Sequence, residues 1–397
     1  MYDFTSLPKR KNSGAYKWAE VEQMYPDNDE IVPLSVADLE LLNAPEITSG
    51  LKTFLDENSL GYGIATDSYF DSVCQWMKRR HNWNVKKEWI LEWNGVVTAF
   101  YDAIALLTSP GDKVMLLSPV YYPFYTAITG RGRQVADVPL LFRDNRYEID
   151  FDLLEKTARD PKTKVMLLCS PHNPIGRVWT REELIRLGRI CVDNNVLVVS
   201  DEIHFDLIMP GYEHTVFASI SEEFAQNCIV CTAPSKTFGL PGLQASNVIV
   251  PNKELRNYLE EEHKKSGFIV LGVLGYKACE IAYSKCSQWL DEFIALLERN
   301  RKTLCAFLEE DLPQIHPIRL EGTYLQWVDC RELPWRGEEL SNRLKKDAGL
   351  FFDDGYVFGE SGDGFERINL ACPTVVLIKA LERWKKAADQ WKRSGRL

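Results

Sequence analysis

The amino-acid sequence predicts an α/β fold in which a mostly parallel sheet carries helices on both faces. Short apolar runs typical of buried strands recur through the middle of the chain, and helical patterns separate several of them. Repeated alternation of strands and helices is typical of parallel sheets. The expected strands cover residues 114–117, 165–168, 196–200, 229–232 and 247–250.

Two helical patterns stand out. One begins at Thr180, which has Glu183 three residues later in the spacing of a capping box, and it continues with an apolar face to Asp193. The other runs from about residue 284 to residue 308, with apolar residues on one face and charges on the other. We interpret this second helix as the link into another domain.

The length of the chain predicts two domains, because 397 residues exceed the usual size of one hydrophobic core. We expect a large domain over residues 48–286. Residues 1–47 show no strand–helix repeat of their own, so we expect them to join residues 287–397 in a smaller α+β domain.

The composition excludes several classes of partner. The net charge of −10 and an isoelectric point near 5.3 argue against nucleic acid, because phosphate binding requires clustered lysine and arginine, and no long basic stripe is present. The chain opens on polar residues and has no apolar stretch long enough to span a bilayer. We therefore expect a cytoplasmic protein that contacts no membrane, and ten irregularly spaced cysteines fit free thiols there.

Cys228 and Cys231 have the spacing of a possible metal-binding or redox pair. Both lie in an expected strand, however, where residues three apart face opposite sides. No second pair of cysteines or histidines has ligand spacing. We therefore predict that the pair packs in the core, and we expect no metal site.

Three expected strands deliver polar side chains at their C-terminal ends, where open α/β sheets bind ligands. These side chains are Asn173, Asp201 and Lys236. A desolvated lysine amine can form a Schiff base, and a carboxylate can keep a pyridine nitrogen protonated. Asn173 and His204 can hydrogen-bond a phenolic ring oxygen. This set of residues therefore satisfies the chemical demands of pyridoxal phosphate.

The order of three motifs resembles that of one enzyme family. The motifs are Asn-Pro-x-Gly at 173–176, Asp-Glu-x-His at 201–204 and Ser-Lys-Thr-Phe-Gly-Leu-Pro-Gly-Leu at 235–243. They resemble the fold-type I, aspartate-aminotransferase-like enzymes that depend on pyridoxal phosphate. Within that family the chain is most similar to the cystathionine β-lyase branch, the carbon–sulfur lyases related to the maltose-regulon modulator. The resemblance runs from Arg10 to Pro373 and implies the same fold and cofactor.

The resemblance also implies how the cofactor is held. The backbone amides of Val96 and Val97, at a helix start after an Asn-Gly turn, would bind its phosphate. Tyr121 would stack on its ring, and Tyr62 would reach the phosphate of a neighbouring subunit, which implies a homodimer. Without the resemblance, the Asn-Gly turn indicates only the start of a helix. Tyr62 is then equally well explained as a loop tyrosine that binds nothing. With these residues the expected cofactor site comprises Val96, Val97, Tyr121, Asn173, Asp201, His204, Ser235, Lys236 and Tyr62.

Arg367 is the candidate clamp for a substrate α-carboxylate, because a planar guanidinium meets a carboxylate bidentately. By the same resemblance, Asn173 and the backbone near Ala37 complete the substrate site. The alternative for Arg367 is a surface salt bridge to a glutamate, which would contribute little stability.

The chain departs from the family's aminotransferases at three positions. Ala233 and Gln244 stand where many of those enzymes have a phosphate-binding serine and arginine, and His204 replaces a tyrosine. Helix amides and Tyr62 must therefore carry more of the phosphate binding, with Thr232 and Ser235 as further possible donors. The same replacements recur in the lyase branch, so they favour lyase chemistry.

We therefore expect β-elimination on a sulfur amino acid such as cystathionine, with Lys236, Asp201 and Tyr121 as the catalytic residues. Lys236 would take the α-carbon proton, and a thiolate would leave the β-carbon, giving pyruvate and ammonia. An aminotransferase would use the same residues and is the alternative. A third possibility is a catalytically silent regulatory protein. The presence of all four expected functional residues argues against it: Lys236, Asp201, Asn173 and Arg367.

Overall fold

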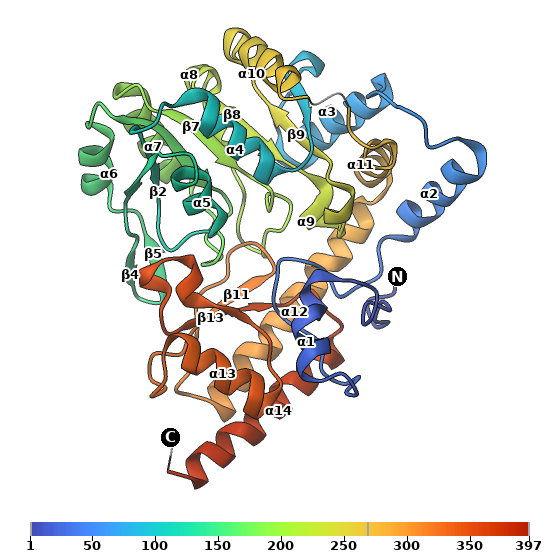
Figure 1. Ribbon diagram of the computed structural model, residues 1–397, viewed down its shortest axis with the longest axis vertical. Coiled ribbons are helices and arrows are strands. Elements are labelled where there is room, and N and C mark those ends of the chain that lie inside the picture. The colour runs from blue at the N-terminus through green and yellow to red at the C-terminus, as the bar shows by residue number, and fades with distance from the viewer. Residues whose placement is uncertain (1, 268–269, 396–397) are drawn as a thin grey trace.

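A seven-stranded sheet forms the centre of the protein, whose computed structural model describes residues 2–267 and 270–395 (Figure 1). The strand order is β1-β9-β8-β7-β6-β2-β3; β9 pairs antiparallel with β1 and β8, and the other neighbouring strands pair parallel. The predicted mostly parallel sheet is therefore confirmed. Its strands are β1 (Ile90–Trp93), β2 (Lys113–Leu116), β3 (Gln134–Asp137), β6 (Thr163–Cys169), β7 (Leu197–Asp201), β8 (Cys228–Thr232) and β9 (Ser246–Ile249).

Alternate residues of the central strands enter two different hydrophobic cores. In β6, Val165 and Leu167 belong to the core beneath α4 (Val96–Leu107), whereas Met166 and Leu168 belong to the core that contains α7 (Arg181–Asp193). This period of two is what a strand buried on both faces requires. Cys228 and Cys231 likewise fall into opposite cores as free thiols, as predicted.

Helices cover both faces of this sheet. On one face lie α4, α5 (Pro123–Thr129) and α10 (Lys253–Lys265), and on the other lie α7 and α8 (Glu222–Gln226). The predicted capping box is present, since Thr180 and Glu183 hydrogen-bond each other's backbone N–H groups at the start of α7. The remaining helices of this half are α2 (Pro45–Glu57), α3 (Asp67–His81), α6 (Phe151–Ala158), α9 (Pro234–Phe238) and α11 (Val273–Lys285).

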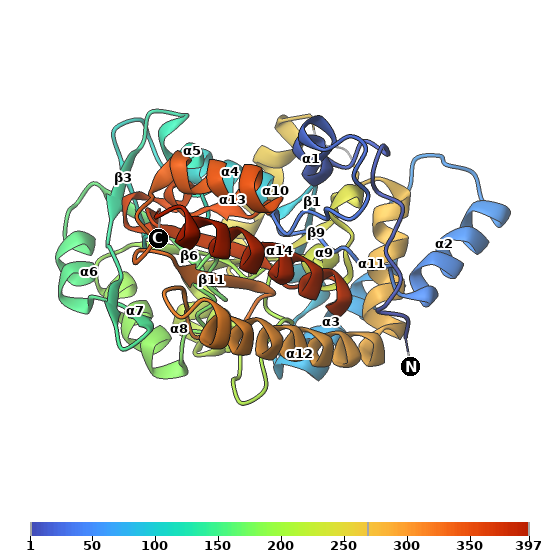
Figure 2. The same ribbon diagram turned by 90° about the horizontal axis from the view of Figure 1, so that it is seen from below.

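The long helix expected over residues 284–308 is α12 (Ser287–Asp311), which starts three residues later than predicted because α11 occupies the chain up to Lys285. α12 lies beside α14 (Thr374–Arg393) along one side of a second sheet (Figure 2). That sheet has the order β10-β11-β13-β12. The elements are β10 (His316–Pro317), β11 (Leu325–Asp329), β12 (Asp353–Asp354), β13 (Phe365–Asn369) and α13 (Gly337–Ala348), and a separate hairpin pairs β4 (Leu141–Arg143) with β5 (Arg146–Glu148).

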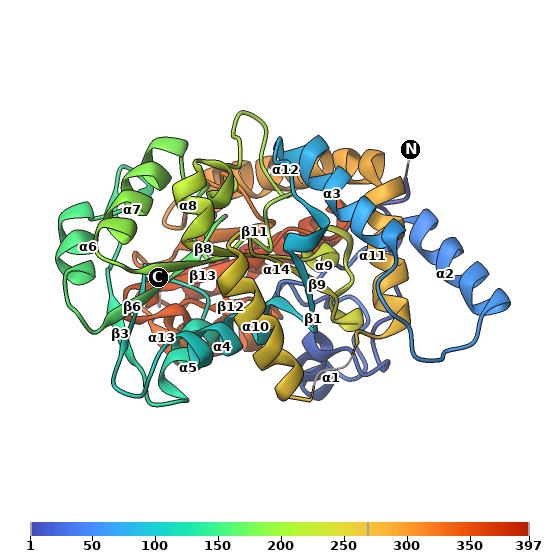
Figure 3. The same ribbon diagram turned by 90° about the horizontal axis from the view of Figure 1, so that it is seen from above.

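The N-terminal segment, which includes α1 (Ala19–Met24), pairs with the C-terminal part of the chain. The backbone N–H of Leu34 donates to Phe351, that of Asn369 donates to Leu34, and that of Glu40 donates to Ala371. The segment then leads into α2, which lies at one edge of the molecule and packs on α11 (Figure 3). The proposed division into residues 48–286 and residues 1–47 with 287–397 stays a prediction.

Residues 2–267 and 270–395 contain neither a membrane-spanning helix nor a cluster of metal ligands. Within these ranges no helix has both the length and the apolar character needed to cross a membrane, and no group of three or more metal-ligating side chains could hold an ion.

Candidate active site

A cavity of about 330 Å³ opens at the C-terminal ends of β6, β7 and β8. These three strands are adjacent and parallel, so the polar side chains that follow them converge, as the sequence predicted. Of the residues expected to form the cofactor and substrate sites, all except Tyr62 line this cavity: Ala37, Val96, Val97, Tyr121, Asn173, Asp201, His204, Ser235, Lys236 and Arg367.

Lys236 enters the cavity from the short helix α9, directly after β8. Its Nζ donates a hydrogen bond of 2.8 Å to the backbone carbonyl of Ala37. Desolvation lowers the pKa of Lys236 from 10.5 to about 8, partly offset by the charge of Asp38. Near pH 7, the neutral fraction of Lys236 is therefore larger than that of an exposed lysine. A neutral amine can act as a nucleophile or accept a proton.

Asp201 is the last residue of β7 and is only 4% exposed. Its Oδ1 accepts a hydrogen bond of 3.2 Å from the backbone N–H of Ile203, and burial raises its pKa from 3.8 to about 7. A buried carboxylate with so little stabilisation needs a cationic partner to stay ionised. A protonated ring nitrogen, such as that of a pyridinium, fits this position.

His204, Asn173 and Tyr121 surround the same space. His204 is 2% exposed, its Nδ1 has no hydrogen-bond partner among the described residues, and burial holds its pKa well below 6.5, so the imidazole is neutral. Burial also raises the pKa of Tyr121, which keeps its phenol protonated. A flat ligand with hydrogen-bonding atoms on its edge would match a neutral imidazole, an amide and an aromatic ring.

The opposite end of the cavity is formed by the start of α4. Gly95 precedes this helix with a φ of 109°, a conformation that favours glycine, and its backbone N–H donates to Ser246 Oγ. The first N–H groups of a helix lack partners within it and attract anions. Val96, Val97 and Ser235 line the cavity here, whereas Thr232 does not and instead donates to the carbonyl of Asn247. The suggestion that Thr232 is a further phosphate donor is therefore wrong.

Arg367 lies in β13 on the second sheet and is 2% exposed. Its Nη1 donates to Asn173 Oδ1 at 2.7 Å, and its Nε and Nη2 donate to Asp353 Oδ2. The alternative of a surface salt bridge to a glutamate is therefore wrong, because the guanidinium is buried at the cavity and its carboxylate partner is an aspartate.

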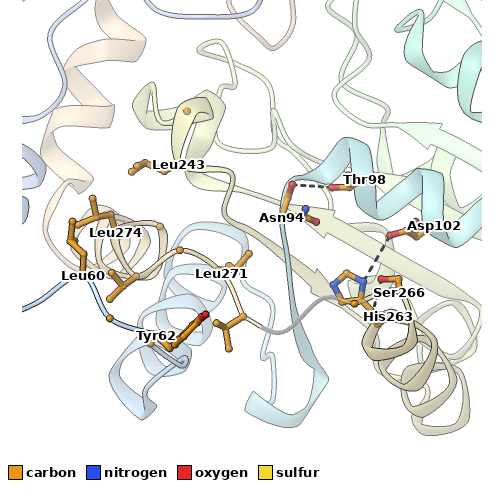
Figure 4. A pocket seen from close by; sticks show the side chains of 18 residues that line it. Leu60, Tyr62, Asn94, Thr98, Asp102, Leu243, His263, Ser266, Leu271 and Leu274 are labelled. Atoms are coloured by element: carbon orange, nitrogen blue, oxygen red, sulfur yellow. Dashed lines mark hydrogen bonds and ion pairs between the residues drawn. The ribbon is translucent and has the colours of Figure 1, made fainter.

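Tyr62 lies outside this cavity and is 97% exposed. It lines a neighbouring pocket of about 890 Å³, with Leu60 on the same side and Asn94 and Thr98 on the other (Figure 4). Asn94 and Thr98 also line the first cavity, so the two spaces adjoin. The role expected for Tyr62 stays a prediction.

Sequence reasoning missed Tyr122, Val36 and Asp353, which also line the cavity. Tyr122 directly follows Tyr121, and a role was assigned to Tyr121 alone. Asp353 occupies a strand of two residues, which is too short to show a periodic pattern.

Comparison with known proteins identifies relatives over nearly the whole chain. Residues 33–383 match the family Aminotransferase class I and II. The chain is 39% identical over 385 residues to the cystathionine beta-lyase PatB of Bacillus subtilis, covering 97% of this chain and 99% of that protein.

Two solved structures are similar throughout. Cystalysin from Treponema denticola, whose crystal structure contains a pyridoxal 5'-phosphate cofactor, superposes with a TM-score of 0.96 at 45% identity, covering 98% of this chain and 99% of that one. A PLP-bound C-S lyase from Staphylococcus hominis, in complex with L-cycloserine, superposes with a TM-score of 0.91 at 29% identity, covering 98% of each chain.

Proposed function

Because the chain belongs to the class I and II aminotransferase family, we propose that it is a pyridoxal-phosphate-dependent carbon–sulfur β-lyase acting on cystathionine or related sulfur amino acids. The observation that carries this proposal is that Lys236, Asp201 and Arg367 line one cavity at the strand ends. They supply an amine, a buried carboxylate and a guanidinium, which an amino-acid substrate and this cofactor together require.

The residues of the cavity fit the cofactor. Asp201 would face the ring nitrogen, Tyr121 would stack on the ring, and Asn173 and His204 would hydrogen-bond the ring oxygen, since all four line the cavity. The backbone amides of Val96 and Val97, together with Ser235, would bind the phosphate. When bound, pyridoxal phosphate supplies an aldehyde for the substrate amine and a ring that accepts electrons from the α-carbon.

Lys236 acts as the general base. Its amine, with a pKa near 8, removes the proton from the substrate α-carbon, while Arg367 holds the α-carboxylate so that this carbon faces Nζ. The ionised Asp201 keeps the ring nitrogen protonated as negative charge develops. The bond from the β-carbon to sulfur then breaks, and the thiolate leaves with the bonding electrons. Water hydrolyses the remaining three-carbon fragment to pyruvate and ammonia.

The proposal is tested by incubating the purified protein with L-cystathionine, with and without 2-oxoglutarate, and measuring pyruvate. A lyase releases pyruvate continuously without the oxo acid. L-Alanine, which has no leaving group on its β-carbon, is the control substrate and gives no continuous release of pyruvate in the absence of 2-oxoglutarate. Formation of glutamate from 2-oxoglutarate without release of pyruvate would instead assign the chain to the aminotransferases.

We also propose that the protein works as a cytoplasmic homodimer in which Tyr62 reaches the partner's phosphate site. Tyr62, Leu60 and Ile64 form an exposed apolar row, 97%, 65% and 73% exposed, beside a pocket that adjoins the cavity. Exposed apolar patches of this kind are typical of interfaces. Sedimentation velocity should give a dimer, and Tyr62→Ala should weaken cofactor binding. A stable monomer with full activity would contradict this assembly.

A further inference from the structure

Asp353 connects two chain segments that line the cavity. Its Oδ2 accepts hydrogen bonds from Arg367 Nε at 3.2 Å and Nη2 at 2.5 Å, and from the backbone N–H of Val36 at 2.7 Å. Arg367 belongs to β13, whereas Val36 belongs to the N-terminal segment. One carboxylate oxygen therefore fixes two chain segments relative to each other.

The contacts of Arg367 leave part of its guanidinium available to a ligand. A guanidinium has five N–H donors in a rigid planar arrangement. Asp353 takes one from Nε and one from Nη2, and Asn173 takes one from Nη1. One N–H on each terminal nitrogen remains, which is the number that a bidentate carboxylate accepts. Asp353 thus holds the edge of the guanidinium that the ligand does not use.

The other segment that Asp353 holds is conformationally strained. Val36 has a φ of 55°, in the left-handed region that β-branched residues rarely adopt. Its N–H donates to Asp353, and its carbonyl accepts from Asn369 Nδ2 at 2.6 Å and from the backbone of Asp38 at 2.8 Å. Strained residues of this kind persist only where their surroundings hold them, and they are concentrated at ligand clamps.

We propose that Asp353 is a positioning residue for the substrate α-carboxylate, and that through Arg367 and the backbone at Val36 it determines the preference for amino acids over simple amines. This inference rests on the proposed use of an amino-acid substrate. Asp353 does not need to touch the substrate, because its effect is to present the two remaining guanidinium N–H groups and the adjoining backbone in one fixed arrangement.

The test compares the binding of L-alanine and ethylamine, which differ by the carboxylate alone, to the protein loaded with pyridoxal phosphate. Binding is followed by the change in cofactor absorbance. Asp353→Ala should weaken L-alanine binding by about ten-fold or more, the scale of a lost hydrogen bond to a charged group, and should leave ethylamine binding unchanged. Asp353→Asn, which keeps an acceptor oxygen, should restore most of the affinity for L-alanine.

Two further variants separate positioning from general damage. Asp354→Ala removes the neighbouring carboxylate of β12, which hydrogen-bonds Tyr356 and does not line the cavity, so it should leave both affinities unchanged. In an Arg367→Ala background, Asp353→Ala should cost less L-alanine affinity than it does in the wild type, because the part of its effect that acts through Arg367 is already lost.

Three results would overturn the inference. These are equal losses for L-alanine and ethylamine in Asp353→Ala, unchanged or tighter L-alanine binding in that variant, or full additivity with Arg367→Ala. Since L-alanine has no leaving group, these binding measurements do not depend on β-elimination.

Discussion

Replacing Asp201 with asparagine should stabilise the cofactor-free protein, and more so at higher pH. Burial raises the pKa of Asp201 from 3.8 to about 7, so the folded cofactor-free protein keeps a proton that the unfolded chain loses between about pH 4 and pH 7. The free energy of unfolding of the cofactor-free wild type therefore falls as the pH rises through this range. The total decrease is about 4 kcal/mol once the carboxyl group of the folded protein is ionised. Asparagine keeps an acceptor for Ile203 N–H and does not titrate.

The difference in unfolding free energy between Asp201→Asn and the wild type should therefore widen by about 2–3 kcal/mol between pH 5 and pH 8. With the unfolding entropy expected for a chain of 397 residues, this is about 3 °C in the relative Tm. The assay is thermal unfolding at the two pH values after removal of cofactor with hydroxylamine and dialysis. Asp152→Asn, which changes a carboxylate that is 99% exposed, is the matched control.

Adding pyridoxal phosphate should then raise the Tm of the wild type more than that of Asp201→Asn, because only the wild type offers an ionised partner to the ring nitrogen. The reasoning is refuted if the difference between the two cofactor-free proteins is the same at pH 5 and pH 8. That result would mean that Asp201 is already ionised in the folded protein without the cofactor.

Two other predictions concern single side chains. Lys236→Ala should abolish turnover, and it should abolish the covalent attachment of cofactor by borohydride, which is measured by mass spectrometry. Lys264→Ala, at an exposed site, is the control and should change neither. Wild-type activity in Lys236→Ala would contradict the assignment. Glu321→Ala should destabilise the fold by about 3 kcal/mol in urea unfolding, because it leaves the buried Arg177 without one of its two carboxylate partners. Glu155→Ala, which removes an exposed pair with Arg159, should cost less than about 1 kcal/mol, and equal losses in the two variants would argue against a special role for the buried pair.

The sequence was sufficient for the parts of the fold and site that depend on local pattern. Asn173, Asp201 and Lys236 each follow an apolar run, and the C-terminal ends of parallel strands meet at one edge, so their convergence could be predicted from spacing alone. The capping box at Thr180 is likewise local. Arg367 and Ala37 required a family resemblance, because nothing in their neighbouring residues indicates a cavity.

Other features depend on contacts that no local pattern records. β1 and β3 were not expected, since each has only four residues and its short apolar pattern is interrupted by polar or charged residues, Glu92 in β1 and Gln134 and Asp137 in β3. The antiparallel direction of β9 was not predicted either, because the connection from β8 through α9 is long enough for either direction. Asp353 was missed because its partners, Val36 and Arg367, are brought to it by tertiary structure alone.

The hydrogen bond between Val36 and Asp353 joins residues that are 317 positions apart, and that between Asn369 and Val36 joins residues 333 apart. At typical rates of protein synthesis, the ribosome adds the later partner about 15–60 s after the earlier one. During this interval the strands of the seven-stranded sheet can emerge and pair, but residues 36–40 cannot yet adopt their final conformation. A nascent or prematurely terminated chain could therefore contain most of the sheet and still lack Asp353 and Arg367, so this side of the cavity forms only after the C-terminal part of the chain has been made.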